Sequence, residues 1–360
     1  MQFTIQSIRA GVTAPFVLSR TVSFLTSGQV LTGAKWNYRL IDALEGDGTT
    51  NLKLSKPKSY QNMVSLMFLN AAPNDQHAKE NLKRERENYL LPSIASGAFF
   101  GKMYDAIGDP TSIGNSGGGG ISYAAFEWLE TTLADVEYRP GNRKYAMAKA
   151  IIKTVLGSCI ILANEELGWH SLMRSDYKPA NILLSDIDTN DISVKVGDLG
   201  LVFRSGSRCS AQPYAMRAPE VWQGQPCTQP SQVWALAAML LCWMKPGILG
   251  TWGCPTPMIR ESWCIAKLMR LFPSWTVPPL DNDVRQCEFN LAKALIDDPP
   301  PALEQISVLE DELRKVDMPI ELMNLVHFML IVNPDERSSA IHVLASNEFL
   351  ALEKAVGSTK

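Results

Sequence analysis

Two polar blocks between residues 174 and 200 constrain this chain more than any other feature of its sequence. Residues 174–184 read RSDYKPANILL and residues 194–200 read VKVGDLG. Four polar side chains stand at set intervals within them: Asp176, Lys178, Asn181 and Asp198. A carboxylate can accept a proton, and amide and carboxylate oxygens are ligands that Mg²⁺ prefers. The blocks therefore indicate a catalytic and metal-binding loop; the alternative is an ordinary polar turn with capping side chains.

The composition limits the class of protein. The 360 residues are 46% hydrophobic and 20% charged, and the net charge of −3 offers no basic footprint for nucleic acid. The longest apolar run, Val233 to Met244, has about a dozen residues, whereas crossing a bilayer takes roughly 20. The seven cysteines include no C-x-x-C pair and the four histidines have no metal-like spacing. We expect an intracellular protein, cytoplasmic or nuclear, without a transmembrane segment, zinc site or disulfide framework.

The N-terminal segment, residues 1–35, has an unusual charge distribution. The first acidic residue of the chain is Asp42, and Arg9, Arg20 and Lys35 precede it among many Ser and Thr. This composition resembles a mitochondrial transit peptide. The alternative, which we prefer, is a polar arm that packs on the folded domain.

Periodicity divides the rest of the chain into a strand-rich part and a helical part. Short runs bounded by turn signals predict strands at 36–44, 50–54, 63–69, 99–107 and 121–128, with a helix over 78–91. Apolar residues at helical spacing predict helices over 145–167, 233–244, 258–272, 320–332 and 338–350. The Pro-rich, acidic stretch 278–317 is expected to be exposed. Strands first and helices after indicate an α+β fold.

The two polar blocks resemble the catalytic loop H-R-D-L-x-x-x-N and the metal loop D-F-G of eukaryotic protein kinases. Over residues 37–352 the chain looks like the SR-protein-kinase-like serine/threonine group, with a degenerate N-terminal half. The resemblance implies a bilobal fold, with a small β-rich N-lobe at 36–128, a larger helical C-lobe at 129–352 and a tail at 353–360. It also implies ATP and Mg²⁺ as cofactors and a protein hydroxyl as substrate.

The resemblance gives each polar residue a role. Asp176 would be the catalytic base, and Lys178 would contact the γ-phosphate, as is typical of serine/threonine kinases. Asn181 and Asp198 would hold Mg²⁺ against the phosphates of ATP. Further along, residues 218–220 (APE) match the family's A-P-E block. Within it, Glu220 would form a buried ion pair with Arg337.

The adenine site is implied by weaker matches. Residues 124–129 (AAFEWL) resemble the strand and hinge that hold adenine. Phe126 would be the gatekeeper, and backbone groups of Glu127 and Leu129 would meet the base. Taken alone, this stretch could be any buried strand.

The N-terminal half departs from the family at the phosphate contacts. Met67 takes the place of the strand lysine, and its helix partner would be Glu85 or, as second choice, Glu87. A methionine offers no charge, so one electrostatic clamp on the phosphates is missing.

The glycine-rich loop is also worn. It retains only Gly46 and Gly48 before Leu52, and Glu45 and Asp47 would repel phosphates. A plain hairpin turn is an equal interpretation. The run Gly117–Gly120 precedes a strand rather than a helix, so we interpret it as a flexible hairpin tip.

Two substitutions affect the supports of the catalytic loop. Ser175 replaces the arginine that would read a phosphorylated activation loop, and Gln232 replaces the F-helix aspartate that braces the catalytic loop.

Two functions remain. Retention of Asp176, Asn181 and Asp198 favours a serine/threonine kinase, although a slow one. Loss of the strand lysine and loop glycines favours the alternative, a catalytically inactive pseudokinase that acts as a binding or scaffold module.

Overall fold

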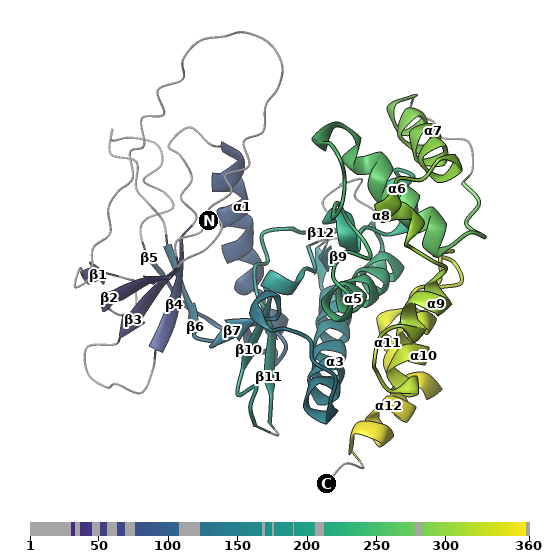
Figure 1. Ribbon diagram of the computed structural model, residues 1–360. Coiled ribbons are helices and arrows are strands. Elements are labelled where there is room, and N and C mark those ends of the chain that lie inside the picture. The colour runs from purple at the N-terminus through teal and green to yellow at the C-terminus, as the bar shows by residue number, and fades with distance from the viewer. Residues whose placement is uncertain are drawn as a thin grey trace.

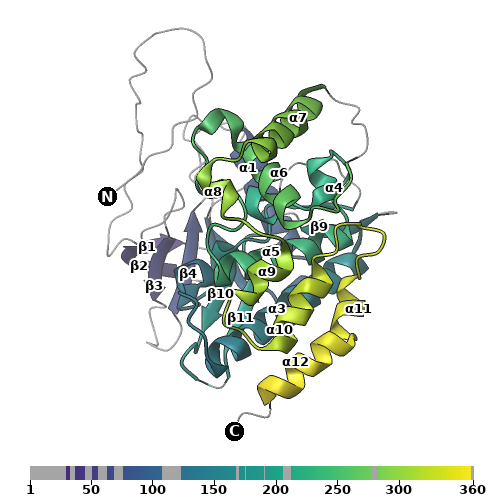
Figure 2. The same ribbon diagram turned by 45° about the vertical axis from the view of Figure 1, so that its right-hand side comes forward.

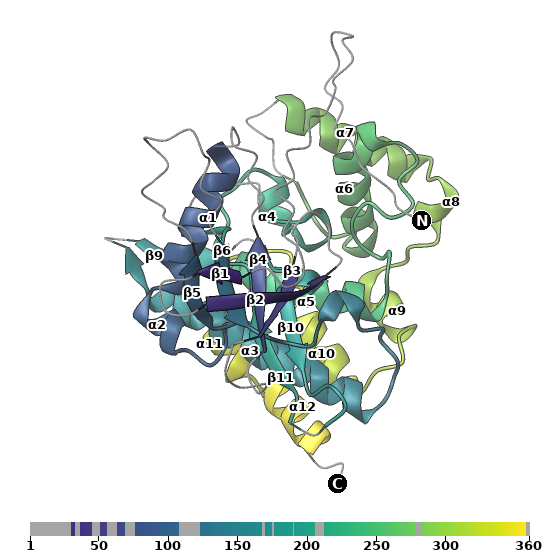
Figure 3. The ribbon, with the colours of Figure 1, turned by 90° about the vertical axis from the view of Figure 1, so that its left-hand side faces the viewer.

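Six antiparallel strands from the first part of the chain form one sheet, in the order β1-β2-β3-β4-β6-β5. The computed structural model describes residues 30–32, 37–44, 51–55, 63–68, 76–107, 123–167, 170–174, 176–189, 191–205, 212–277 and 283–357. The sheet strands are β1 Val30–Thr32, β2 Asn37–Leu44, β3 Asn51–Ser55, β4 Met63–Phe68, β5 Met103–Ile107 and β6 Tyr123–Glu127. Figure 3 views the molecule from the side of this sheet.

The predicted strands of this half are present, with two differences. The strand predicted over 99–107 begins only at Met103, because Phe100 instead forms a bridge with Val196 of another sheet. Val30–Thr32, which we had assigned to the N-terminal arm, pairs with β2. Most of residues 1–35 lie outside the described residues, so both interpretations of that segment stay predictions.

The second half of the chain is mainly helical, which confirms the mixed α+β class. Its helices lie on the opposite side of the molecule from the sheet, and α1 stands between the two (Figure 1). The helices are α1 Gln76–Tyr89, α2 Pro92–Ser96, α3 Asn142–Asn164, α4 Pro219–Trp222, α5 Gln229–Met244, α6 Arg260–Leu271, α7 Asp283–Asp297, α8 Pro301–Glu304, α9 Leu309–Arg314, α10 Ile320–Met329, α11 Ala340–Leu344 and α12 Asn347–Gly357.

Helix α5 forms the centre of the hydrophobic core. It begins with a capping box between Thr228 and Ser231, which satisfies the first free backbone N–H groups of the helix. Its residues 231–241 are all buried, as expected of a helix that is apolar on every side. Helices α3, α10 and α11 pack around it, and Figure 2 shows this packing with α10, α11 and α12 in front.

Helix α3 is long and apolar enough to cross a membrane by length and composition, alone among the helices of the described residues. Within this fold, 61% of its most apolar window is buried. Strands β9 and β11 and helices α5, α11 and α12 contact it. The helix ends at Asn164, earlier than the predicted 167, because Glu166–Leu167 form strand β8.

The stretch 278–317 is exposed only in part, whereas we predicted an exposed segment throughout. Apart from residues 278–282, which lie outside the described part, it forms helices α7, α8 and α9. Prolines begin helix α8, where a missing N–H costs nothing. Apolar side chains between the acidic ones are buried: Phe289, Leu303, Leu309 and Leu313. The acidic composition concealed an amphipathic pattern that contributes to the core.

Two small three-stranded sheets hold the polar blocks. One has the order β11-β10-β7 and the other β12-β9-β8. Their strands are β7 Thr131–Thr132, β8 Glu166–Leu167, β9 His170–Arg174, β10 Ile182–Ser185, β11 Ser193–Val196 and β12 Val202–Arg204. Because β10 and β11 are antiparallel and Ile182 pairs with Val196, the residues just before β10 and just after β11 meet at one end of the hairpin.

Candidate active site

The first polar block places three of its predicted residues in contact. Strand β9 ends at Arg174, and a short 3₁₀ turn over Pro179–Asn181 leads into β10. The Asp176 carboxylate is nearly buried, with the residue 5% exposed. Its Oδ2 lies 3.1 Å from the Lys178 ammonium and accepts a 2.9 Å hydrogen bond from Asn181 Nδ2. Asp176 is therefore oriented from two sides, as a proton acceptor needs to be.

A backbone hydrogen bond joins the second block to the first. The N–H of Gly197 donates to the carbonyl oxygen of Asn181 at 2.9 Å. A β-carbon at Gly197 would lie 2.8 Å from the Leu183 side chain, so a larger residue there would displace that leucine. Asp198 follows with φ of 55°, a left-handed conformation that Asp adopts more readily than most residues and that Asp186, in a turn, also adopts. Such strained residues cluster at functional sites.

The oxygen atoms of this site fit Mg²⁺. Asn181 uses its Nδ2 toward Asp176, which leaves its amide oxygen to act as a ligand, and Asp198 provides a carboxylate. Among the described residues, no group of three or more His, Cys, Asp and Glu could hold a metal ion. Two hard oxygen ligands without a full protein cage match the way Mg²⁺ binds, because it retains waters and relies on substrate phosphates.

Helix α1 packs against the second block through several polar contacts. Asn88 Nδ2 donates to the carbonyl oxygen of Leu199 at 2.8 Å, and Arg84 Nη1 donates to that of Gly200 at 3.2 Å. Of our two candidate helix partners, Glu85 is buried, whereas Glu87 is exposed and lies 3.8 Å from Lys83. Glu85 is therefore the glutamate that α1 directs toward the site.

Glu85 is buried, and no lysine or arginine of the described residues forms an ion pair with it. Burial, and after it the nearby Asp198, raise the pKa of its carboxyl to about 8, although Arg174 and a hydrogen bond with the Leu199 backbone oppose the shift. Its Oε1 has no hydrogen-bond partner.

The predicted nucleotide contacts of the N-terminal half are only partly described. Leu52 lies on β3 paired with Leu66, and Met67 lies on β4 paired with Ala124. The side chains of both, and all of Gly46 and Gly48, lie outside the described residues, as do Glu45, Asp47 and Gly117–Gly120. The roles predicted for them stay predictions.

The predicted adenine contacts are placed as follows. Phe126 is buried, and its ring meets that of Tyr89 of α1 edge-on at 4.8 Å. The N–H of Glu127 donates to the Lys102 carbonyl at 2.7 Å, and the predicted contact of its backbone with a base stays a prediction. Leu129 follows β6 and is half-buried.

Sequence reasoning missed the residues that support the first block. Arg174 is fully buried, and two of its nitrogens donate to the Asp176 carbonyl oxygen. The Tyr177 hydroxyl lies 3.0 Å from the hydroxyl of Ser158 and accepts a 3.2 Å hydrogen bond from the thiol of Cys159, both on α3. The only signal in the sequence was their position within the block, because a charged residue beside a loop is normally exposed.

Gln232 does brace the loop, as its position predicted. The side chain is fully buried on α5, and its Nε2 donates to the Arg174 carbonyl at 3.0 Å. Its Oε1 has no partner. The neutral amide therefore donates a hydrogen bond to a carbonyl, a contact that an ionised carboxylate, which only accepts, could not make.

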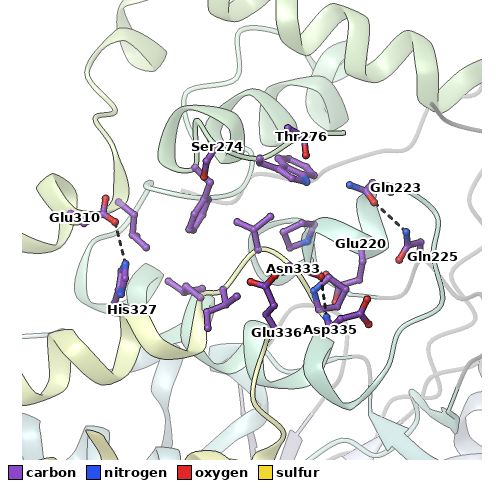
Figure 4. Close-up of a pocket in the computed structure, with 18 residues that line it drawn as sticks. Glu220, Gln223, Gln225, Ser274, Thr276, Glu310, His327, Asn333, Asp335 and Glu336 are labelled. Atoms are coloured by element: carbon purple, nitrogen blue, oxygen red, sulfur yellow. Dashed lines mark hydrogen bonds and ion pairs between the residues drawn. The ribbon is translucent and has the colours of Figure 1, made fainter. Parts of the chain in front are cut away.

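The predicted ion pair between Glu220 and Arg337 is confirmed. Arg337 Nη1 and Nη2 lie 2.9 and 3.1 Å from the two carboxylate oxygens, and both residues are buried. Next to this pair is a cavity of about 580 Å³ between α4, the end of α6 and α10 (Figure 4). None of Asp176, Asn181 and Asp198 lines it, so it is separate from the candidate active site.

No protein family model matches the chain. No curated protein is significantly similar to it.

Proposed function

We propose that this chain is an ATP- and Mg²⁺-dependent serine/threonine protein kinase of reduced rate, with a bilobal kinase-like fold. The observation that carries the proposal is the joining of the two polar blocks. Asp176, Lys178 and Asn181 contact one another, and the Asn181–Gly197 hydrogen bond brings Asp198 to the same end of the β10–β11 hairpin. Phosphoryl transfer needs a proton acceptor, a cation and two metal ligands in one place.

Each residue has one task in this proposal. Asp176 accepts the proton of the substrate hydroxyl. At the same time the oxygen of that hydroxyl bonds to the γ-phosphorus of ATP, and the bond between the γ-phosphorus and the β-phosphate oxygen breaks. Lys178, 3.1 Å from Asp176, neutralises the transferred group. Asn181 and Asp198 would hold Mg²⁺, which supplies positive charge to the phosphates of ATP when bound.

The second candidate function is a pseudokinase that binds without transferring phosphate. The state of Glu85 favours it, because no cation of the described residues pairs with this buried carboxyl and Met67 occupies the position of the strand lysine. A site that lacks this clamp holds the α- and β-phosphates less well, and phosphates that are poorly held are poorly oriented for transfer.

The test compares wild type with Met67→Lys and Asp176→Ala in a phosphorylation assay on a generic serine peptide. Lysine and methionine both have unbranched stems, and we expect Glu85 to pair with the new cation. Single donors on a charge that grows in the transition state are worth on the order of 10²–10³ in rate. We expect slow transfer by wild type, an increase of about that factor in Met67→Lys, and none in Asp176→Ala.

Two outcomes would reject the enzyme. Transfer that survives Asp176→Ala belongs to a contaminant, and absence of transfer in both wild type and Met67→Lys leaves the scaffold function. A thermal-shift titration with ATP, with and without Mg²⁺, tests binding separately, because a ligand that binds only the folded state raises the melting temperature.

A further inference from the structure

Arg174 is a buried arginine whose hydrogen bonds go to the backbone of the residue proposed as base. Its side chain has no exposed surface. Nε and Nη2 donate to the carbonyl oxygen of Asp176, at 3.2 and 3.0 Å. Asn181 Nδ2 donates to the same oxygen at 3.0 Å. Three donors to one carbonyl oxygen hold the peptide group that follows Asp176 more firmly than a loop peptide is normally held.

The arginine is itself held by both central helices. Its guanidinium carbon lies 5.1 Å from the centre of the Tyr177 ring, and the Tyr177 hydroxyl is bonded to Ser158 on α3. From the other side, Gln232 of α5 donates to the Arg174 carbonyl. Arg174 thus connects the core of the fold to the backbone of Asp176 through short, defined contacts.

Stability does not account for this arrangement. Arg174 forms no ion pair among the described residues, and its Nη1 has no hydrogen-bond partner. A buried guanidinium without a contacting carboxylate costs folding free energy, and an unpaired buried N–H adds to the cost. A neutral apolar side chain would fill the space at a smaller cost in folding free energy. A role in holding the site therefore explains the residue better.

We propose that Arg174 is a positioning residue, whose forked guanidinium holds the Asp176 peptide in the orientation that phosphoryl transfer needs. This inference rests on the proposed function of Asp176. An arginine can reach one carbonyl with two nitrogens at once, whereas a lysine has a single ammonium. Misplacement of a catalytic group by about 1 Å can cost on the order of 10²-fold in rate.

The experiment uses the full chain with Arg174→Met and Arg174→Lys. Lys267→Met is the matched control. Lys267 is another buried cation, lies on α6, and among the described residues donates to backbone carbonyls, those of Gly247 and Trp252. Under the proposed function we expect Arg174→Met to lower kcat about 10²-fold with KM for ATP unchanged. Arg174→Lys should fall between it and wild type. Lys267→Met should lose stability but retain its kcat.

Amide hydrogen exchange gives a second readout that needs no activity. The N–H groups of Asn181 and Gly197 are hydrogen-bonded within the site. We expect both to exchange at least tenfold faster in Arg174→Lys than in wild type, and faster still in Arg174→Met if that variant folds, with no change in Lys267→Met. If wild type transfers no phosphate, the proposed kinase activity is rejected. The exchange rates then still test whether Arg174 holds the backbone of the site. Unchanged exchange in Arg174→Lys, or a kcat loss no larger than that of Lys267→Met, would overturn the inference.

Discussion

The Glu220–Arg337 pair gives the sharpest test of how the helical half is held together. The perturbation is Arg337→Ala. The guanidinium makes five hydrogen bonds: two to the Glu220 carboxylate and one each to the carbonyls of Pro230, Ile331 and Val332. It also lies 5.0 Å from the centre of the buried Trp234 ring. Removing it leaves Glu220 buried with Ser231 as its remaining hydrogen-bond donor.

The expected cost follows from burial on both sides. The side chains are 0% and 3% exposed, so neither charge is screened by water. Removing one partner of such a pair costs about 3–5 kcal/mol, because the other charge stays buried. The three carbonyls that lose a donor place the value toward the upper end. For a protein larger than 150 residues this corresponds to a fall in Tm on the order of 10 °C.

The assay is denaturant unfolding followed by circular dichroism, with two comparisons. Arg139→Ala removes an ion pair of equally short distance, 2.7 Å to Glu137, whose side chains are 79% and 73% exposed. Exposed pairs are worth about 0–1 kcal/mol, so this variant should unfold nearly as wild type does. The double change Glu220→Gln with Arg337→Met should cost less than the two single changes together. A loss below about 1 kcal/mol in Arg337→Ala would refute the reasoning.

Three further predictions concern the candidate active site. The Glu85 pKa of about 8 in the folded chain exceeds the unfolded value of 4.5, so the folded state holds a proton that the unfolded state releases. Wild type should therefore lose stability relative to Glu85→Gln as pH rises from 4.5 to 8, by on the order of 5 kcal/mol at most, and a pH-independent difference in unfolding free energy would contradict this. Asp198→Asn should abolish Mg²⁺-dependent stabilisation by ATP while leaving Tm without ligand near that of wild type, as melting curves with and without metal will show. Because Ser175 replaces the arginine that would pair with a phosphate, Ser205→Glu should leave the phosphorylation rate unchanged, and a large gain in the peptide assay would disprove this.

The fold class and the order of the elements could be predicted because period and polarity are local properties. Strands β2 and β4 and helices α5 and α6 lie close to their predicted bounds. The stretch 278–317 was misjudged because proline and acidic residues dominate its composition, whereas its sparse apolar residues decide its packing. Local composition does not report which side chains meet the core.

The candidate site likewise has contacts that the sequence predicts and burial that it does not. The contact between Asp176 and Asn181 follows from five-residue spacing across one turn, and the sequence shows that spacing directly. The burial of Arg174 and Glu85 does not follow from spacing, because it depends on α1, α3 and α5, which are far apart in the chain. Charged residues that tertiary structure forces into the interior are those that sequence patterns describe least well.

Because the Cys159 thiol is hydrogen-bonded to the Tyr177 hydroxyl, the rate at which Cys159 is alkylated can report on opening of the 176–181 loop. Burial raises the pKa of the Cys159 thiol to about 12, so at neutral pH almost no thiolate is present while the fold is closed. Cys287 on α7 is exposed, Cys242 and Cys254 are half-buried, and Cys209 lies outside the described residues, so the peptide that carries Cys159 must be followed by itself. Alkylation of Cys159 then requires separation of the loop from α3, and its rate measures how often that separation occurs. The alkylation rate of Cys159 thus measures loop opening, and it can be followed by mass spectrometry without nucleotide or substrate.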